Sequence, residues 1–421
     1  MQSSIKLRLT VMNFLQFAVW GAYLTSMGRY LGTAGFGSEI GNFYAMQGLV
    51  SLFMPALMGI VADRWIPAQR LLGLCHTLAG MLMLGVFLYT QTDTPSYPTL
   101  FALYSLSVAF YMPTLALSNS VAYTSLDQAG LDLVKSFPPI RVFGTVGFIC
   151  TMITVSLLGL EATSGQFAVS AIISLVLAVY AQTLPNCPTA PKGQSKSLVE
   201  ALGLRAFVLF KQRKMALFFI FSMLLGVSLQ ITNGFANPFI STFGEIPAYA
   251  DTFGVKYANI LISLSQLSET LCILLIPFAL RRFGIRRVML IAMVAWVLRF
   301  ALLGLGNPGS GVWLFLLSMI VYGVAFDFFN VSGSLFVDKE TDPSIRSSAQ
   351  GLFMIMTNGI GATLGSLGAQ AVINHFVYSE HDTTAILAGW SMSWYVFAAY
   401  AAVVAVLFAL LFRYNTVTEA K

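Results

Sequence analysis

The sequence predicts an all-α membrane protein, and three observations carry this prediction. Hydrophobic residues make up 57% of the 421 residues. Charged residues make up only 10%, whereas a soluble chain usually carries about 25%. Apolar stretches of about 20 residues, each long enough to cross a bilayer as a helix, recur from one end of the chain to the other.

Twelve of these stretches are predicted to be transmembrane helices. They are 7–28, 40–62, 71–91, 97–121, 138–160, 165–184, 215–242, 257–280, 288–306, 311–337, 347–373 and 388–412. The first stretch is too long for the apolar core of a signal peptide and lacks a clear small-residue cleavage site, so it is interpreted as a retained span.

Basic residues are distributed unevenly around the predicted spans. If the N-terminus lies inside, 19 of the 23 Lys and Arg residues fall in cytoplasmic loops and tails. Only Arg29 and Lys256 fall outside, while Arg141 and Arg299 lie within spans. This bias predicts that both termini are cytoplasmic, because positive charge remains on the cytoplasmic side of a membrane. It also accounts for the net charge of +6, so no nucleic-acid partner is expected.

A polar segment divides the predicted spans into two sets of six. Residues 185–214 begin with PNCPTAPKGQSKS and end with KQRK, a composition that suits a cytoplasmic linker. The sequence therefore predicts an N-terminal half at 1–184 and a C-terminal half at 215–421. The halves also share a basic loop after their second helix, GIVADRWIPAQR in the first and LRRFGIRRV in the second.

This arrangement resembles the major facilitator superfamily. Gly59, Ala62, Asp63 and Arg64 match that family's pattern after the second helix, although the expected following glycine is absent and Pro67 lies nearby. The charges of this loop could form a gate between the halves or simply anchor helix ends. The resemblance implies that substrate binds near the bilayer midplane, between two halves that rock around it.

Polar and aromatic side chains inside the predicted spans form four groups, and each group shares one helical face. The groups are Arg141, Thr145 and Phe148; Gln230 and Asn233; Gln266 and Glu269; and Tyr322, Phe326 and Asp327. Polar residues are costly in lipid and mark functional positions. These groups therefore predict the binding site of a transporter.

Glu269 is the most unusual member, because the chain carries no other charge between Lys256 and Arg281. At about 1.5 Å per residue, it lies near the middle of its span. Carboxylate and amide groups supply hydrogen-bond donors and acceptors, and the aromatic members supply flat faces. This combination suits a polar ring compound with hydroxyls. A sugar, a nucleoside and another aromatic polar solute fit these residues about equally.

Longer strings resemble the bacterial nucleoside permeases of the nucleoside:H⁺ symporter family, and the similarity covers essentially the whole chain. They include FMPALMGIVADRW, FPPIRVFGTVGF, SLSQLSETLCILLIPF and IVYGVAFDFFNVSGSLFVDKE. The resemblance implies purine and pyrimidine nucleosides as substrates, driven by inward proton flow across the bacterial inner membrane. The residues that match the family's substrate site are Arg141, Thr145, Phe148, Gln230, Asn233, Gln266, Glu269, Tyr322 and Phe326, with Asp327 beside them.

Glu269 and Asp327 are the candidates for carrying the proton, because apolar surroundings favour the neutral form of a carboxyl group. Glu269 could instead bind substrate alone, and Asp327 could anchor its helix or pair with Arg141. A proton-coupled sugar or oligosaccharide symporter of the same superfamily is the alternative function. No enzyme activity, cofactor or metal is expected, since motifs for intramembrane catalysis do not occur. The chain is expected to function as a monomer in the lipid bilayer.

Overall fold

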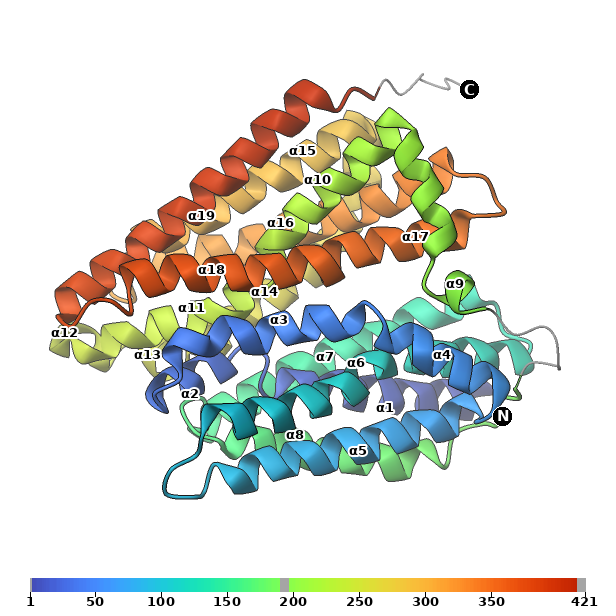
Figure 1. The fold of residues 1–421 in the computed structure, drawn as a ribbon, viewed down its shortest axis with the longest axis horizontal. Coiled ribbons are helices and arrows are strands. Elements are labelled where there is room, and N and C mark those ends of the chain that lie inside the picture. The colour runs from blue at the N-terminus through green and yellow to red at the C-terminus, as the bar shows by residue number, and fades with distance from the viewer. Residues whose placement is uncertain (1, 190–196, 415–421) are drawn as a thin grey trace. The chain divides into compact units, whose positions relative to one another are not determined.

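The computed structural model is built from helices and describes residues 2–189 and 197–414, which contain no β-strand. The chain divides into two compact units, Met1–Leu202 and Gly203–Lys421. Their helices run from blue to red along the chain in Figure 1. The division falls within the predicted linker 185–214, of which residues 190–196 lie outside the described residues.

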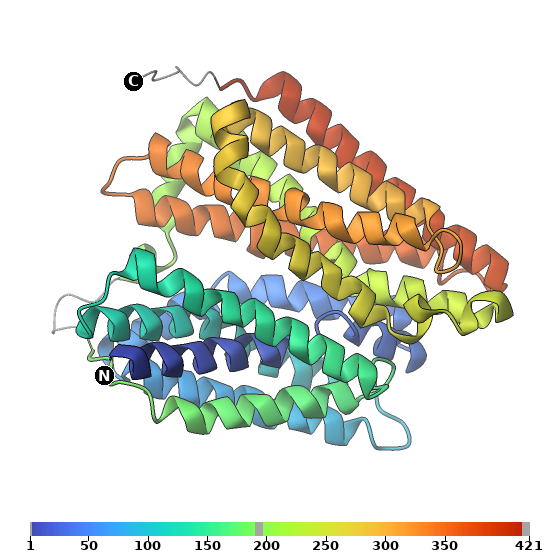
Figure 2. The same cartoon turned by 180° about the vertical axis from the view of Figure 1, so that it is seen from behind.

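The first unit is formed by helices that pack on one another in sequence-distant pairs. Its elements are α1 Gln2–Gly21, α2 Met27–Thr33, η1 Gly37–Glu39, α3 Ile40–Ser51, α4 Met54–Arg64, α5 Ala68–Tyr89, α6 Tyr97–Gln128, α7 Leu133–Leu157, α8 Gly165–Ala181 and α9 Leu198–Ala201. Helix α1 packs on α7 and α8, as Figure 2 shows, and α5 packs on α6 and α8. Helices from the beginning and from the end of this unit therefore pack together in its core.

The described part of the second unit contains three helices of 29 or 30 residues, α15, α16 and α19. Its elements are η2 Leu204–Lys211, α10 Arg213–Leu229, α11 Ile231–Thr242, η3 Phe243–Glu245, α12 Pro247–Ala250, α13 Phe253–Lys256, α14 Ala258–Cys272, η4 Ile273–Leu275, α15 Ile276–Leu305, α16 Val312–Glu340, α17 Arg346–Met354, the π-helical η5 Ile355–Gly361, α18 Ala362–Phe376 and α19 Thr383–Leu411. Helix α15 packs on both α16 and α19, and α14 packs on α16 (Figure 1).

Among the described residues, nine helical stretches are long and apolar enough to cross a membrane, beside the shorter apolar helix α8. The predicted spans 257–280 and 288–306 fall in one of these stretches, because α15 continues through a bend at Gly284. The φ of Gly284 is 75°, a left-handed conformation that glycine adopts without steric cost. Helix α1, which begins with the polar stretch QSSIKLR, is not among the nine. The count of twelve spans stays a prediction.

Glycine allows close approach at two helix crossings that carry candidate site residues. A Cβ atom added to Gly147 of α7 would collide with the backbone of Phe14 in α1. A Cβ atom added to Gly323 of α16 would lie 2.5 Å from the carbonyl oxygen of Ser268 in α14. Because small residues let helix backbones touch, these crossings hold α7 against α1 and α16 against α14.

Candidate functional site

In the first unit, the candidate residues of α7 lie against aromatic side chains of α1. The guanidinium of Arg141 lies 4.0 Å from the centroid of the Phe17 ring. The ring of Phe148 meets that of Trp20 edge to face, with centroids 6.3 Å apart and an interplanar angle of 86°. Phe148 is buried, whereas Arg141 and Thr145 are half-buried. Helix α1 therefore contacts both Arg141 and Phe148, the first and the last candidate residue of α7.

Trp20 is a residue of this region that the sequence patterns did not single out. Its ring lies 6.0 Å from that of Tyr111 in α6. Its indole N–H is buried and has no hydrogen-bond partner among the described residues. Tryptophan usually occupies the ends of membrane helices. The position of Trp20 inside the predicted span 7–28 is therefore the sequence feature that could have identified it as a candidate site residue. An unpartnered indole N–H can donate to a ligand.

In the second unit, two amides lie together where the predicted span 215–242 is interrupted. Helix α10 ends before Gln230 and α11 begins after it. The side-chain N–H of Asn233 donates to the side-chain oxygen of Gln230 at 2.8 Å. On the same helix, Asn237 donates to Asn259 of α14 at 3.0 Å.

A second cluster joins α14 to α16. Glu269 is half-buried and close enough to Tyr322 and Asp327 to interact electrostatically with both. The rings of Tyr322 and Phe326 stack with centroids 5.5 Å apart and an interplanar angle of 16°. Two carboxyl groups and an aromatic pair therefore lie together.

Two oxygens near this cluster are buried without a hydrogen-bond partner among the described residues. They are Oε1 of Gln266 and Oδ2 of Asp327. The whole Asp327 residue is only 4% exposed. Buried polar atoms without partners are costly, and these two oxygens can accept hydrogen bonds from a ligand or, at Asp327, take a proton.

The two basic loops differ in what their charged residues contact. Asp63 and Arg64 lie in the last turn of α4, directly before the turn into α5. In the second unit, the Arg286 guanidinium donates to the carbonyl oxygens of Phe412 at 2.6 Å and Ala409 at 2.7 Å. Arg286 thus anchors the end of α19, the simpler of the two roles considered for these loops. The gating role of Asp63 and Arg64 stays a prediction.

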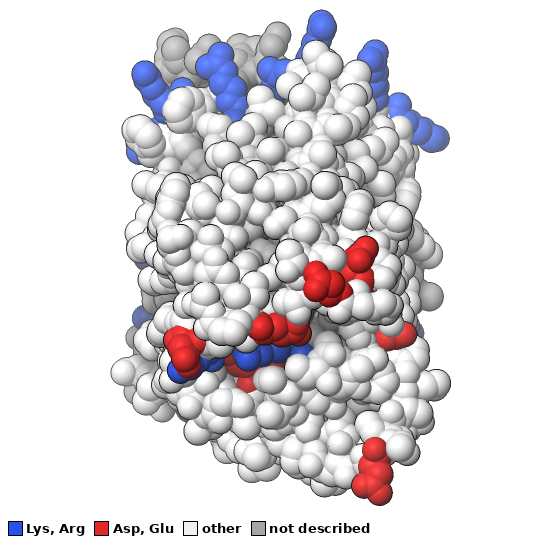
Figure 3. All heavy atoms as spheres, turned by 90° about the vertical axis from the view of Figure 1, so that its left-hand side faces the viewer, with Lys and Arg blue, Asp and Glu red and all other residues white. Residues whose placement is uncertain are grey.

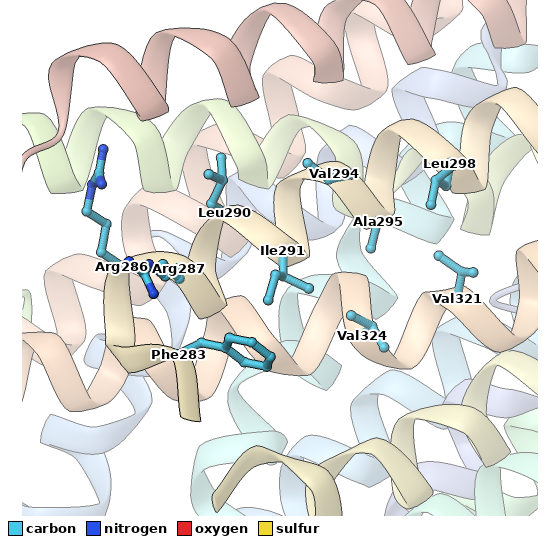
Figure 4. Close-up of a pocket in the computed structure, with 10 residues that line it drawn as sticks. All are labelled: Phe283, Arg286, Arg287, Leu290, Ile291, Val294, Ala295, Leu298, Val321 and Val324. Carbon is cyan, nitrogen blue, oxygen red and sulfur yellow. The ribbon is translucent and has the colours of Figure 1, made fainter. Parts of the chain in front are cut away.

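An apolar groove between α15 and α16 is separate from the candidate residues (Figure 4). Its lining residues are Phe283, Arg286, Arg287, Leu290, Ile291, Val294, Ala295, Leu298, Val321 and Val324. Val294 and Leu298 are about half exposed. Apart from Arg286 and Arg287, the lining side chains are apolar, and none of the candidate site residues lines the groove.

Carboxyl groups inside the predicted spans and a helical fold of two units are typical of a membrane transporter of the major facilitator type. A sequence model described as nucleoside H⁺ symporter matches residues 3–417. The chain therefore belongs to the nucleoside H⁺ symporter family, which confirms the family predicted from the sequence strings.

The relatives agree with this membership. The chain is 50% identical over 415 residues to the xanthosine permease of Escherichia coli K12, covering 98% of this chain and 97% of the relative. It is 46% identical over 417 residues to the nucleoside permease NupG of the same organism, with the same coverage. The crystal structure of nucleoside transporter NupG matches with a TM-score of 0.89 at 46% identity, covering 98% of this chain and 100% of that chain.

Proposed function

We propose that this protein imports purine and pyrimidine nucleosides together with protons, by alternating access in the bacterial inner membrane. The observation that carries the proposal is the cluster on α14 and α16, where Glu269 interacts electrostatically with Tyr322 and the Tyr322 ring stacks on that of Phe326. A nucleoside combines a flat base, which stacks on aromatic rings, with ribose hydroxyls, which donate to a carboxylate.

The remaining candidate residues, from both units, are also proposed to bind the substrate. The substrate-binding residues proposed are Arg141, Thr145, Phe148, Gln230, Asn233, Gln266, Glu269, Tyr322 and Phe326. Their amides can read the donors and acceptors on the edge of a base. Asp63 and Arg64 are proposed to gate the transport cycle, and the protein is proposed to work as a monomer surrounded by lipid.

Proton coupling is proposed to use the carboxyl pair of Glu269 and Asp327. Two carboxylates close together with little water cannot both be ionised without a large cost, so one of them takes up a proton. Proton uptake from outside would remove a buried charge, favour nucleoside binding and permit the switch to the inward-facing state. Asp327 suits this role because its Oδ2 atom is buried without a donor among the described residues.

Uptake in cells that lack their own nucleoside permeases tests the proposed function. Cells that express the protein are expected to accumulate labelled uridine and adenosine, and a protonophore is expected to abolish the accumulation. Excess unlabelled nucleosides should compete, whereas glucose or lactose at the same excess should not. Uptake blocked by sugars but not by nucleosides would support the alternative sugar symporter instead.

Orientation in the membrane is a further prediction. Figure 3 shows both basic and acidic side chains on one face of the molecule, and the basic loops predict that both termini are cytoplasmic. In a variant without native cysteines, Asp93→Cys should react with an impermeant maleimide in intact cells. Asp93 follows α5, which corresponds to the third predicted span, so with the N-terminus inside it lies on the outer side of the membrane. Asp342→Cys, which follows α16, should react only after lysis. The reverse pattern would invert the orientation.

A further inference from the structure

We propose that Arg299 is a positioning residue of the nucleoside site, because its guanidinium fixes the ring of Tyr322 on which the base is bound together with Phe326. This inference rests on the proposed function and adds a residue that the candidate site did not include. Arg299 belongs to α15, a helix that carries none of the candidate substrate-binding residues.

The contacts of Arg299 connect α15 to α16 at the position of Tyr322. The guanidinium carbon lies 4.6 Å from the centroid of the Tyr322 ring. The guanidinium also donates to the carbonyl oxygen of Ser318 at 2.8 Å. In return, the hydroxyl of Ser318 donates to the backbone carbonyl of Arg299 at 2.9 Å. Ser318 precedes Tyr322 by one helical turn, so both contacts lie on the same face of α16.

The burial of Arg299 shows that its cation remains inside the protein. The residue is only 2% exposed, so its side chain does not extend to the membrane surface. Its Nε atom is buried without a hydrogen-bond partner among the described residues. A charge within a membrane span is costly, and apolar residues often replace buried ionic groups without loss of stability. Stability alone therefore does not explain an arginine at this position.

The geometry of Tyr322 supplies the explanation. Trp296, one turn before Arg299 on α15, meets the Tyr322 ring edge to face at 5.9 Å and 87°. Arg299 lies against the same ring, and a guanidinium stacks on aromatic faces through its planar shape and its charge. Two residues of α15 therefore hold the ring in the orientation in which it stacks on Phe326. A ring that is already fixed loses less freedom when a base binds to it.

The test compares two arginines of the same helix by equilibrium binding of labelled uridine to the purified protein. Arg299→Lys keeps the charge but loses the planar stacking group, so its Kd is expected to rise about tenfold. Arg286→Lys is the matched control, since Arg286 donates to backbone carbonyls at the end of α19 and is not a candidate site residue. Its Kd is expected to change by less than about twofold. Equal effects of the two substitutions would overturn the proposal.

A double substitution separates positioning from a general structural effect. If Arg299 acts through the Tyr322 ring, Arg299→Lys should raise Kd by less than about twofold in a Tyr322→Leu background. The same tenfold rise in both backgrounds would contradict the proposal. Thermal unfolding of each purified variant verifies that the fold is retained. A parent protein that binds no nucleoside would refute the proposed function itself, which distinguishes the two failures.

Trp296→Leu provides a second variant if Arg299→Lys does not yield folded protein. It removes the other contact from α15 to the Tyr322 ring while leaving every charge in place. Its Kd for uridine is expected to rise by about fivefold, which corresponds to the free energy of one aromatic pair. An unchanged Kd in the folded variant would show that contacts from α15 do not position the ring.

Discussion

The Glu269→Gln variant is expected to lose nucleoside accumulation while it retains nucleoside exchange across the membrane. Glutamine has nearly the shape of a protonated glutamate, but it cannot release a proton. Accumulation requires that the carrier binds and releases a proton in each cycle, whereas exchange of internal for external nucleoside needs no net proton movement. The variant should therefore mimic a carrier that is permanently protonated.

Affinity tests the other possibility, in which Asp327 carries the proton and Glu269 accepts hydrogen bonds from the ribose as a carboxylate. A hydrogen bond to a charged group contributes roughly 1.5–3 kcal/mol, so in that case Kd is expected to rise about 10- to 100-fold. Glu245→Gln is the matched control in the same unit. Glu245 is exposed in η3 and accepts a hydrogen bond from Thr383 at 2.9 Å, outside the candidate site. Its uptake is expected to equal that of the parent protein.

The measurements are uptake of labelled uridine with and without an inward proton gradient, and counterflow in vesicles preloaded with uridine. Full accumulation by Glu269→Gln that still follows the proton gradient would exclude Glu269 as the proton carrier. Asp327→Asn then decides between the two carboxyl groups. If Asp327 is the carrier, its asparagine variant should show the exchange without accumulation, and Glu269→Gln should show only the weaker affinity.

Local features of the fold and site could be predicted from the sequence. Apolar length locates the helices, and long shared strings identify the family. Contacts within one helix also follow from its periodicity. Tyr322 and Phe326, four residues apart in α16, stack on each other, and Gln230 at the start of α11 accepts a hydrogen bond from Asn233, three residues further on. Such pairs depend only on the 3.6-residue turn.

Contacts between helices could not be predicted in the same way. The proximity of Glu269 to Tyr322 and the placement of Arg299 against that ring depend on how α14, α15 and α16 rotate and pack. Periodicity identifies a polar face but does not identify the helix that it meets. The break between α10 and α11 at Gln230 was also missed, because apolar length alone predicts one continuous helix for 215–242.

The Gly323→Ala variant tests whether the contact between α14 and α16 positions the site. The added Cβ atom would lie 2.5 Å from the carbonyl oxygen of Ser268, so the two helices must separate. Overpacking of this kind typically costs about 1–3 kcal/mol of unfolding free energy. Nucleoside binding should weaken as well, because Ser268 directly precedes Glu269 and Gly323 directly follows Tyr322. Any separation therefore moves the carboxylate away from the ring.

Gly368→Ala is the matched control, because a Cβ atom added to Gly368 in α18 has no other atom within 4 Å. Alanine is favoured over glycine inside a helix by about 1 kcal/mol, so this control should be at least as stable as the parent protein. Thermal unfolding and uridine binding of the two purified variants provide the comparison. Gly323→Ala should unfold at a lower temperature and bind uridine more weakly. If its affinity instead matches that of Gly368→Ala, the distance between Glu269 and Tyr322 does not set nucleoside affinity, and the carboxylate and the aromatic pair act independently.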